Sequence, residues 1–264
     1  MGNVAMFVTT DDGCRLNVIP GTPGLPPLVL SNSLGSDHSL WDSQVESFST
    51  VRSVWRYDTR GHGGSDVPDG EYSIDRLGKD LLAIIDATGA PQVDICGVSI
   101  GGVTALWTAL HAPHRVRRVV LANTAAKIGD ESMWSARMAT ARTEGMTGLA
   151  DATMMRWFTP EFRAAHPEVV DRFRAVIART NGHGYSGCCA ALRDADLRAL
   201  APQVACPTLV VTGLHDPATP PDQGRWLAQQ IPAARLTEFK SAHLSNVECA
   251  DEFNAAVLDF TIGE

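Results

Sequence analysis

The strongest constraint on the fold is a repeated alternation of short apolar runs with helix-like stretches. The apolar runs are rich in Val, Ile and Leu, and they occupy residues 27–31, 51–58, 92–97, 116–123, 207–213 and 234–240. Runs of this kind are typical of strands that are covered on both faces, which is the situation in a parallel sheet. The sequence therefore predicts an α/β domain with a mostly parallel central sheet.

Helix-like stretches lie between these runs at a spacing that suits crossover connections. They cover residues 40–48, 74–88, 100–111, 223–231 and 250–260. This arrangement predicts helices on both faces of the sheet. Ahead of the first buried run, AMFVTTDDGCRLNVI has a DDG turn between two alternating segments, and we expect an N-terminal antiparallel hairpin there.

One long segment interrupts the alternation. Between Lys127 and Arg198 no strand pattern occurs, and the chain offers helical pieces such as MWSARMATART and PEVVDRFRAVIART. A helical insertion between two strands of an open α/β sheet is expected to cover the carboxyl edge of the sheet, where such folds bind ligands. We therefore predict a core domain of residues 1–126 and 199–264 and a helical cap of residues 127–198.

Composition and charge exclude several classes of protein. Asp and Glu number 30 against 22 Lys and Arg, for a formal net charge of −8, which argues against binding to nucleic acid or to an acidic membrane surface. The sequence shows no secretion signal and no membrane-spanning apolar stretch, so we expect a cytoplasmic protein. The oligomeric state stays open, a homo-oligomer included.

The cysteines are scattered without the paired short spacings of a zinc site. All six, at positions 14, 96, 188, 189, 206 and 249, are expected to be free thiols. A metal cluster of His183, Cys188 and Cys189 is disfavoured, because adjacent cysteines on one short segment rarely both face one ion. We predict no metal site.

A glycine-flanked serine stands where the run at 92–97 meets the helix-like stretch at 100–111. Gly97, Ser99 and Gly101 form the pattern Gly-x-Ser-x-Gly. In this strand-turn-helix context the pattern predicts a nucleophile elbow, in which a strained turn exposes the serine hydroxyl beside a helix N-terminus. The alternative is a glycine-rich turn whose serine has no chemical role.

A serine hydroxyl requires a general base and an acid that orients the base. Asp216 follows the run at 207–213, and His243 follows the run at 234–240. The resulting chain order of Ser, Asp and His is the one that this architecture requires. The end of the run at 116–123 can also hold the acid, but it carries Asn123. We therefore predict a catalytic triad of Ser99, His243 and Asp216.

Two other histidines are candidates for the base. His62 follows an earlier strand, and His215 stands next to the predicted acid. Both fit the required chain order less well than His243.

An oxyanion hole requires two backbone N–H groups near the serine. Ile100, directly after Ser99, is expected to supply one. The other should come from the loop SNSLGSDHSLW, where we select Leu34 because Ser33 and Gly35 allow close approach of the backbone. A plain connecting loop is the alternative.

Several longer stretches narrow the assignment. They are LSNSLGSDHSLWDSQV, WRYDTRGHGGSDVPDGEYSIDRL, CGVSIGGVTAL, ANTAAKIG, ARTEGM, RWFTPEF and SAHLSNVE. Together they span nearly the whole chain, and they closely resemble the 3-oxoadipate enol-lactonases within the α/β-hydrolase fold. The resemblance implies hydrolysis of 3-oxoadipate enol-lactone to 3-oxoadipate in aromatic catabolism, with no cofactor.

A lactone that carries a free carboxylate requires local positive charge in an acidic protein. Residues 127–198 hold ten Lys and Arg against nine Asp and Glu, whereas the rest of the chain holds 12 against 21. The cap is therefore the expected anion-binding part. Trp134 and Arg137, three residues apart, are predicted to share a helix face as an apolar wall and a carboxylate fork, and the resemblance supports both positions.

Other interpretations of these features remain open at this point. Arg142 and Arg156 are alternative carboxylate ligands, and Arg137 could be a surface residue beside a core tryptophan. A carboxylesterase or a carbon–carbon bond hydrolase for a related small acid is the alternative enzyme, since the same triad serves all three reactions. A catalytically silent binding protein of the same fold is disfavoured because Ser99, Asp216 and His243 are all present.

Overall fold

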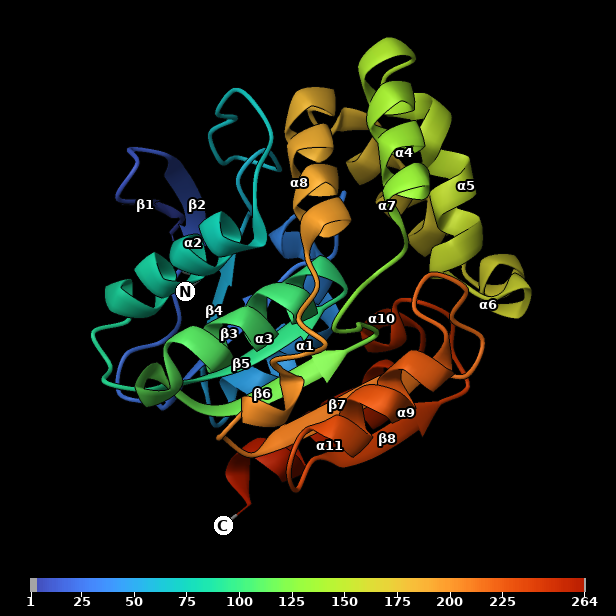
Figure 1. Ribbon diagram of the computed structural model, residues 1–264. Coiled ribbons are helices and arrows are strands. Elements are labelled where there is room, and N and C mark those ends of the chain that lie inside the picture. Colours follow the sequence, from blue (N-terminus) through green and yellow to red (C-terminus); the bar gives the residue numbers. More distant parts are fainter. Residues whose placement is uncertain (1–3, 264) are drawn as a thin grey trace.

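In the computed structural model, which describes residues 4–263, eight strands form one sheet in the order β1-β2-β4-β3-β5-β6-β7-β8 (Figure 1). The strands are β1 (Met6–Thr9), β2 (Arg15–Ile19), β3 (Pro27–Ser31), β4 (Ser53–Tyr57), β5 (Val93–Val98), β6 (Val116–Ala122), β7 (Thr208–Gly213) and β8 (Arg235–Phe239). Strands β3 to β8 pair in parallel, while β1 and β2 form an antiparallel hairpin. The predicted sheet and hairpin are confirmed.

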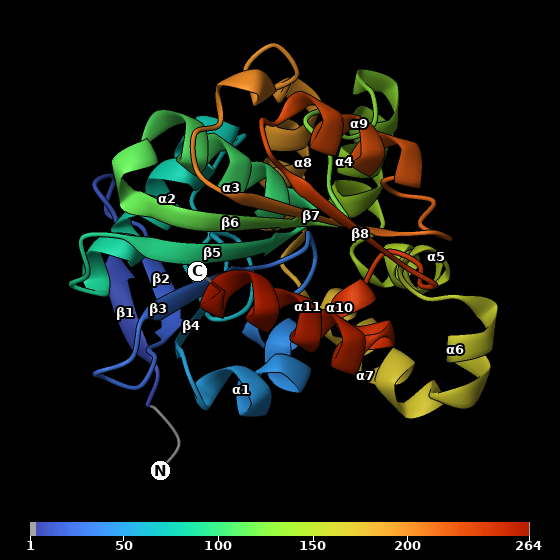
Figure 2. The same ribbon diagram turned by 90° about the horizontal axis from the view of Figure 1, so that it is seen from below.

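Helices cover both faces of the sheet, as predicted. Figure 2 shows α2 (Ile74–Ala87), α3 (Ile100–His111) and α9 (Pro221–Gln230) on one face, with α1 (Asp42–Ser49), α10 (Ser245–Glu248) and α11 (Ala250–Ile262) on the other. Short 3-10 turns lie at η1 (His38–Trp41), η2 (Pro113–Arg115) and η3 (Ala201–Gln203). Because helices lie against both faces, every residue of β5 and β7 is buried.

The edge strand β8 corrects one part of the sequence interpretation. Its run is predicted to be covered on both faces, yet Arg235, Leu236 and Glu238 are exposed. This strand lies at the end of the sheet, where β7 is its neighbour. An edge position leaves one side of the strand to solvent, and the charged residues in the run suit that exposure.

Five helices fill the connection between β6 and β7. They are α4 (Glu131–Thr143), α5 (Thr147–Trp157), α6 (Pro160–Ala165), α7 (Pro167–Arg179) and α8 (Gly182–Asp194). Local sequence sets their starts, since side chains of Asp130, Thr159 and Asn181 accept hydrogen bonds from backbone N–H groups of the first turns. The helices gather beyond one end of the sheet (Figure 1). The division into core and cap at residues 127 and 198 stays a prediction.

Two general features of the described chain bear on function. Within residues 4–263, no helix combines the length and the apolar character needed to cross a bilayer, and no cluster of three His, Cys, Asp or Glu side chains could hold a metal ion. The six cysteines are unpaired, and five of them are buried.

Candidate active site

Ser99 stands in a strained turn between β5 and α3. Its backbone has φ 59° and ψ −120°, a conformation that costs a residue with a Cβ about 1–3 kcal/mol and is concentrated at functional sites. A Cβ at Gly97 would collide with the carbonyl of Gly101, and a Cβ at Gly101 would collide with the carbonyl of Ser31. Strand and helix approach so closely that only glycine fits on either side of the serine. The backbone therefore has the elbow geometry that the pattern predicts.

Asp216 and His243 come together at the carboxyl ends of β7 and β8. His243 Nδ1 lies 2.9 Å from Asp216 Oδ2, and both side chains are buried. Asp216 Oδ1 also accepts from the N–H groups of Ala218 and Thr219, at 2.8 and 3.0 Å, and Oδ2 accepts from the Thr219 hydroxyl at 2.7 Å. Burial alone would raise the pKa of Asp216, but His243 and the Thr219 hydrogen bonds outweigh it and lower that pKa below its ordinary value. An ionised Asp216 can thus orient His243 and leave Nε2 for proton transfer.

Asn123 supports the acid from the end of β6. It is fully buried with a φ of 44°, and its Nδ2 donates to Asp216 Oδ2 at 3.2 Å and to the carbonyl of Ala242 at 3.1 Å. The amide therefore connects the loop that carries the acid with the loop that carries His243. Sequence reasoning used Asn123 only to exclude an acid at this position, and no local signal pointed to its part in holding Asp216.

Ser99 and His243 line one cavity of about 90 Å³. We call its two walls the core side and the cap side. The core side consists of Ser33, Leu34, Ser99, Pro217, Ala218 and His243, and the cap side consists of Ile128, Met133, Trp134, Arg137, Thr153, Arg156, Trp157 and Tyr185. Asp216 joins the cavity through its hydrogen bond to His243. The three residues therefore lie around one cavity at one end of the sheet, and their role as a catalytic triad stays a prediction.

The two rival histidines are placed elsewhere. His62 is buried, and both of its ring nitrogens are engaged: Nε2 accepts from the N–H of Gly35 at 3.0 Å, and Nδ1 lies 3.2 Å from the carbonyl of Arg60. Burial lowers the pKa of His62, which keeps the ring neutral in this role. His215 is exposed, and neither histidine lines the cavity of Ser99.

The predicted oxyanion donors are Leu34 and Ile100. Leu34 lines the cavity, and Ile100 directly follows Ser99 as the first residue of α3, with its side chain buried outside the cavity wall. Among residues 4–263, neither N–H group donates a hydrogen bond. Both are therefore available to a ligand oxygen, and their role stays a prediction.

The cap side carries two positive charges. The guanidinium of Arg137 stacks over Trp134, 5.1 Å from the ring centroid. Burial, together with repulsion from Arg137, lowers the pKa of Arg156 to about 10. Among the described residues, the cap arginines at 172, 174, 179, 193 and 198 pair with carboxylates. Those at 137, 142, 156 and 163 do not, and of these only Arg137 and Arg156 line the cavity. Arg156 Nη2 donates to Thr153 Oγ1 at 3.0 Å, and both guanidinium groups are only partly buried. Two such positive charges in one small cavity favour binding of an anion there.

The two alternative carboxylate ligands, Arg142 and Arg156, occupy different positions relative to the cavity. Arg156 lines the same cavity as Arg137. Arg142 is exposed and stands outside that cavity. The structure therefore brings together Trp134, Arg137 and Arg156 and leaves Arg142 apart. Sequence reasoning missed Tyr185 and Thr153, which line the cavity from α8 and α5.

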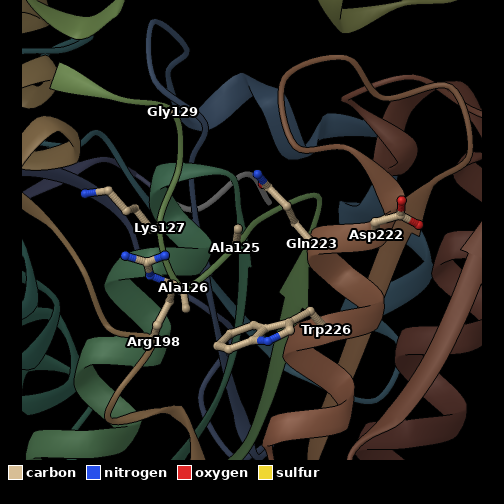
Figure 3. A pocket seen from close by; sticks show the side chains of 8 residues that line it. All are labelled: Ala125, Ala126, Lys127, Gly129, Arg198, Asp222, Gln223 and Trp226. Carbon is tan, nitrogen blue, oxygen red and sulfur yellow. The ribbon is translucent and has the colours of Figure 1, made fainter. Parts of the chain in front are cut away.

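A larger cavity, of about 430 Å³, lies at the connection from β6 to α4. Figure 3 shows Lys127 and Arg198 on one side of it and Gln223 and Trp226 on the other. None of the predicted site residues lines this cavity. Size alone therefore does not locate the candidate active site, which is defined by the chemistry of Ser99 and His243.

Comparison with known proteins covers most of the chain. The family described as "alpha/beta hydrolase fold" matches residues 26–249. The chain is 42% identical over 237 residues to 3-oxoadipate enol-lactonase 2 of Acinetobacter baylyi, covering 90% of this chain and 89% of that relative. It is 36% identical over 250 residues to 3-oxoadipate enol-lactonase 1 of the same organism, covering 94% of each.

A solved structure gives the same result in three dimensions. The enol-lactonase from Burkholderia xenovorans matches with a TM-score of 0.95 and 42% identity, covering 97% of this chain and 100% of that one. The resemblance that the sequence motifs indicate is therefore confirmed.

Proposed function

The chain belongs to the α/β-hydrolase family, and we propose that it is a carboxylic ester hydrolase that converts 3-oxoadipate enol-lactone to 3-oxoadipate. The reaction class is supported by the enol-lactonase relatives, which match over most of the chain. The observation that carries the substrate class is a pair of arginines, Arg137 and Arg156, that line the same cavity as Ser99 and His243 and have no carboxylate partner among the described residues. This cavity offers a nucleophile and a site for a carboxylate within one small space.

In the first half of the proposed reaction, Ser99 Oγ attacks the lactone carbonyl while His243 Nε2 accepts the hydroxyl proton. Asp216 stabilises the imidazolium through the 2.9 Å hydrogen bond to Nδ1. The N–H groups of Leu34 and Ile100 bind the oxyanion of the tetrahedral intermediate.

In the second half, the intermediate collapses and the ring C–O bond breaks. The leaving group is an enolate, which takes the proton from His243 and stays attached through the rest of the ring. Water then attacks the acyl-enzyme ester and gives a proton to His243 as the base. When the new tetrahedral intermediate collapses, His243 returns this proton to Ser99 Oγ, and the carboxylate product is released. The enol ketonises to 3-oxoadipate. Every atom of the lactone is thus retained until the final step.

The cap side binds the substrate carboxylate in this proposal. Arg137 and Arg156 supply charge-assisted hydrogen bonds, and Trp134 holds the Arg137 guanidinium in place and provides an apolar wall. The cavity volume of about 90 Å³ is well below the roughly 300–1,000 Å³ of pockets for larger ligands. This size favours a compact acid over a long-chain ester.

The proposed mechanism assigns catalysis and substrate selection to different segments of the chain. We propose that residues 1–126 and 199–264 form the catalytic core and that residues 127–198 form the cap that selects the substrate. A cytoplasmic location is part of the proposal, supported by six unpaired thiols, which persist in a reducing compartment.

Substrate comparison tests the proposed function. We expect kcat/KM for 3-oxoadipate enol-lactone to exceed that for p-nitrophenyl acetate and for a vinylogous diketone acid. Progress is followed by loss of the enol-lactone absorbance and by release of p-nitrophenolate. Equal or higher turnover of the acetate ester would assign a general carboxylesterase, and equal or higher turnover of the diketone would assign a carbon–carbon bond hydrolase.

A further inference from the structure

The loop that carries Leu34 is a tight turn with two separate supports. The carbonyl of Ser33 accepts hydrogen bonds from the N–H of Ser36 at 3.2 Å and from the Ser36 hydroxyl at 2.7 Å. Leu34 and Gly35 are the central residues of this turn, and Gly35 has φ 85°, as the third position of a type II turn requires. The Ser33 carbonyl and the Leu34 N–H belong to the same planar peptide. Fixing the carbonyl on one side therefore aims the N–H on the other.

The second support comes from His62. The Gly35 N–H is not used by the turn itself, and it donates to His62 Nε2 at 3.0 Å. His62 Nδ1 lies 3.2 Å from the carbonyl oxygen of Arg60. Because a carbonyl oxygen only accepts hydrogen bonds, Nδ1 carries the proton and Nε2 is left as the acceptor. The peptide that follows Leu34 is thereby fixed, just as Ser36 fixes the peptide that precedes it.

His62 is itself held rigidly. The turn that carries it is tied to Asp58, whose carboxylate accepts from the N–H of Gly64 at 2.8 Å and from Asn17 at 2.9 Å. The same turn contacts the cap through Gly61, whose backbone packs directly against the backbone of Gly184 in α8. The contact is so close that a Cβ on either glycine would collide with the other. Because this turn is fixed on both sides, the hydrogen bond from Gly35 to His62 holds the loop that carries Leu34 at a fixed position.

We infer that His62 is a positioning residue of the oxyanion hole, which holds the Leu34 N–H on target by accepting the Gly35 N–H. The inference rests on the proposed hydrolase function, because it assigns a support to the proposed donor. An oxyanion donor contributes about 10²–10³ in kcat when it is well placed. A displaced donor is expected to lose part of that factor, since the donor acts on the transition state more than on the bound substrate.

A matched pair of variants tests this role. In H62N the amide replaces Nδ1 and keeps its contact with Arg60 but cannot reach Gly35, whereas in H62Q the amide oxygen can replace Nε2 as the acceptor. We expect H62N to lower kcat about 10–100-fold with KM within about twofold, and H62Q to recover most of that loss. H111Q, on a histidine at the far end of α3, serves as the control.

The rates are measured per active site, titrated with a fluorophosphonate, so that loss of folded protein does not count as loss of kcat. An H62N protein with unchanged kcat, or an H62Q protein as slow as H62N, would overturn the inference. Should H62N not fold, H62L decides: it fills the same buried space without an acceptor for the Gly35 N–H, and a kcat lowered about tenfold or more supports the inference, while an unchanged kcat overturns it.

Every variant is assayed on both 3-oxoadipate enol-lactone and p-nitrophenyl acetate. The wild-type comparison of the two substrates tests the proposed function by itself. If the lactone is not turned over, the acetate ester still reports on the oxyanion hole, because any ester forms the same tetrahedral oxyanion at Ser99. Failure of the substrate assignment and failure of the His62 inference are therefore distinguishable.

Discussion

The core side and the cap side of the cavity differ in whether their charged groups have partners within the protein. On the core side, the charge of Asp216 is fully satisfied by His243, Thr219, Ala218 and Asn123 before any ligand binds. On the cap side, Arg137 and Arg156 face the cavity without a carboxylate partner among the described residues. In the proposed function, the contrast therefore separates catalytic groups that are already hydrogen-bonded from arginines whose charge a ligand would neutralise. Chemistry should therefore depend on the core side, and substrate choice should depend on the cap side.

Removal of the nucleophile is expected to have the largest effect. Ser99→Ala should lower kcat by about 10⁵–10⁶ for every ester substrate, because the acyl-enzyme cannot form. The measurement is hydrolysis of enol-lactone and of p-nitrophenyl acetate at high enzyme concentration, with substrate binding monitored by tryptophan fluorescence. A residual rate within a hundredfold of wild type would assign the chemistry to another group.

Removal of the acid follows in size. Asp216→Asn should lower kcat by about 10³–10⁴, because the amide favours the wrong tautomer of His243. Adding Asn123→Asp to that variant places a carboxylate where Asn123 Nδ2 now lies 3.2 Å from Asp216, and it should recover at least about tenfold of the loss. The assay is steady-state hydrolysis, and a loss below tenfold in the single variant contradicts the proposed triad.

Two glycine-to-alanine substitutions, one in the core and one in the cap, compare these regions by the free energy of unfolding. Gly101→Ala places a Cβ against the Ser31 backbone and should lower the free energy of unfolding by about 3 kcal/mol or more. Gly148→Ala in cap helix α5 meets nothing closer than 3.7 Å and should raise it by about 0.5–1 kcal/mol. Urea unfolding measures both, and equal losses at the two positions would contradict the steric closure of the elbow at Gly101.

The cap arginines should act on substrate binding. Arg137→Met and Arg156→Met are each expected to raise KM for the enol-lactone about 10–100-fold, the equivalent of one charge-assisted hydrogen bond. KM for neutral p-nitrophenyl acetate should change by less than about twofold in the same proteins. Arg142→Met, on an exposed side chain outside the cavity, is the control. A KM that is unchanged for the lactone in both variants would place its carboxylate elsewhere.

The smallest effect concerns an ion pair on the core, His38 with Asp58, at 2.9 Å. The hydrogen bond to Asp58 raises the pKa of His38, so its stabilisation is present below the unfolded value near 6.5 and is lost as pH rises through the folded value. Burial would raise the pKa of Asp58, but hydrogen bonds from His38 and Gly64 lower it below its ordinary value. The stabilisation that comes from ionised Asp58 is therefore lost only when the pH falls through this lowered pKa. His38→Gln should therefore lower the free energy of unfolding by about 1 kcal/mol at pH 5.5 and by less at pH 9. Urea unfolding at the two pH values measures this, and an equal loss at both would deny the ion pair.

Much of the fold and of the catalytic half of the site followed from local sequence. The apolar runs predicted six strands because burial on both faces demands continuous apolar residues, although the edge strand β8 is largely exposed and the prediction that its run is covered on both faces is wrong. The elbow followed from Gly97, Ser99 and Gly101, since close approach of strand and helix excludes a Cβ. Asp216 and His243 could be placed because the carboxyl ends of parallel strands share one edge of the sheet.

Tertiary structure alone decided the rest. Which of Arg142 and Arg156 lines the cavity depends on how α4 and α5 pack over it, and helical spacing within one segment does not determine that packing. His62 has the residue type of a base, yet its contact with Gly35 across 27 residues makes it a support. Asn123 likewise holds Asp216 from 93 residues away. Such hydrogen bonds join chain segments that local periodicity treats as independent, so they exist only once the sheet has brought its loops together.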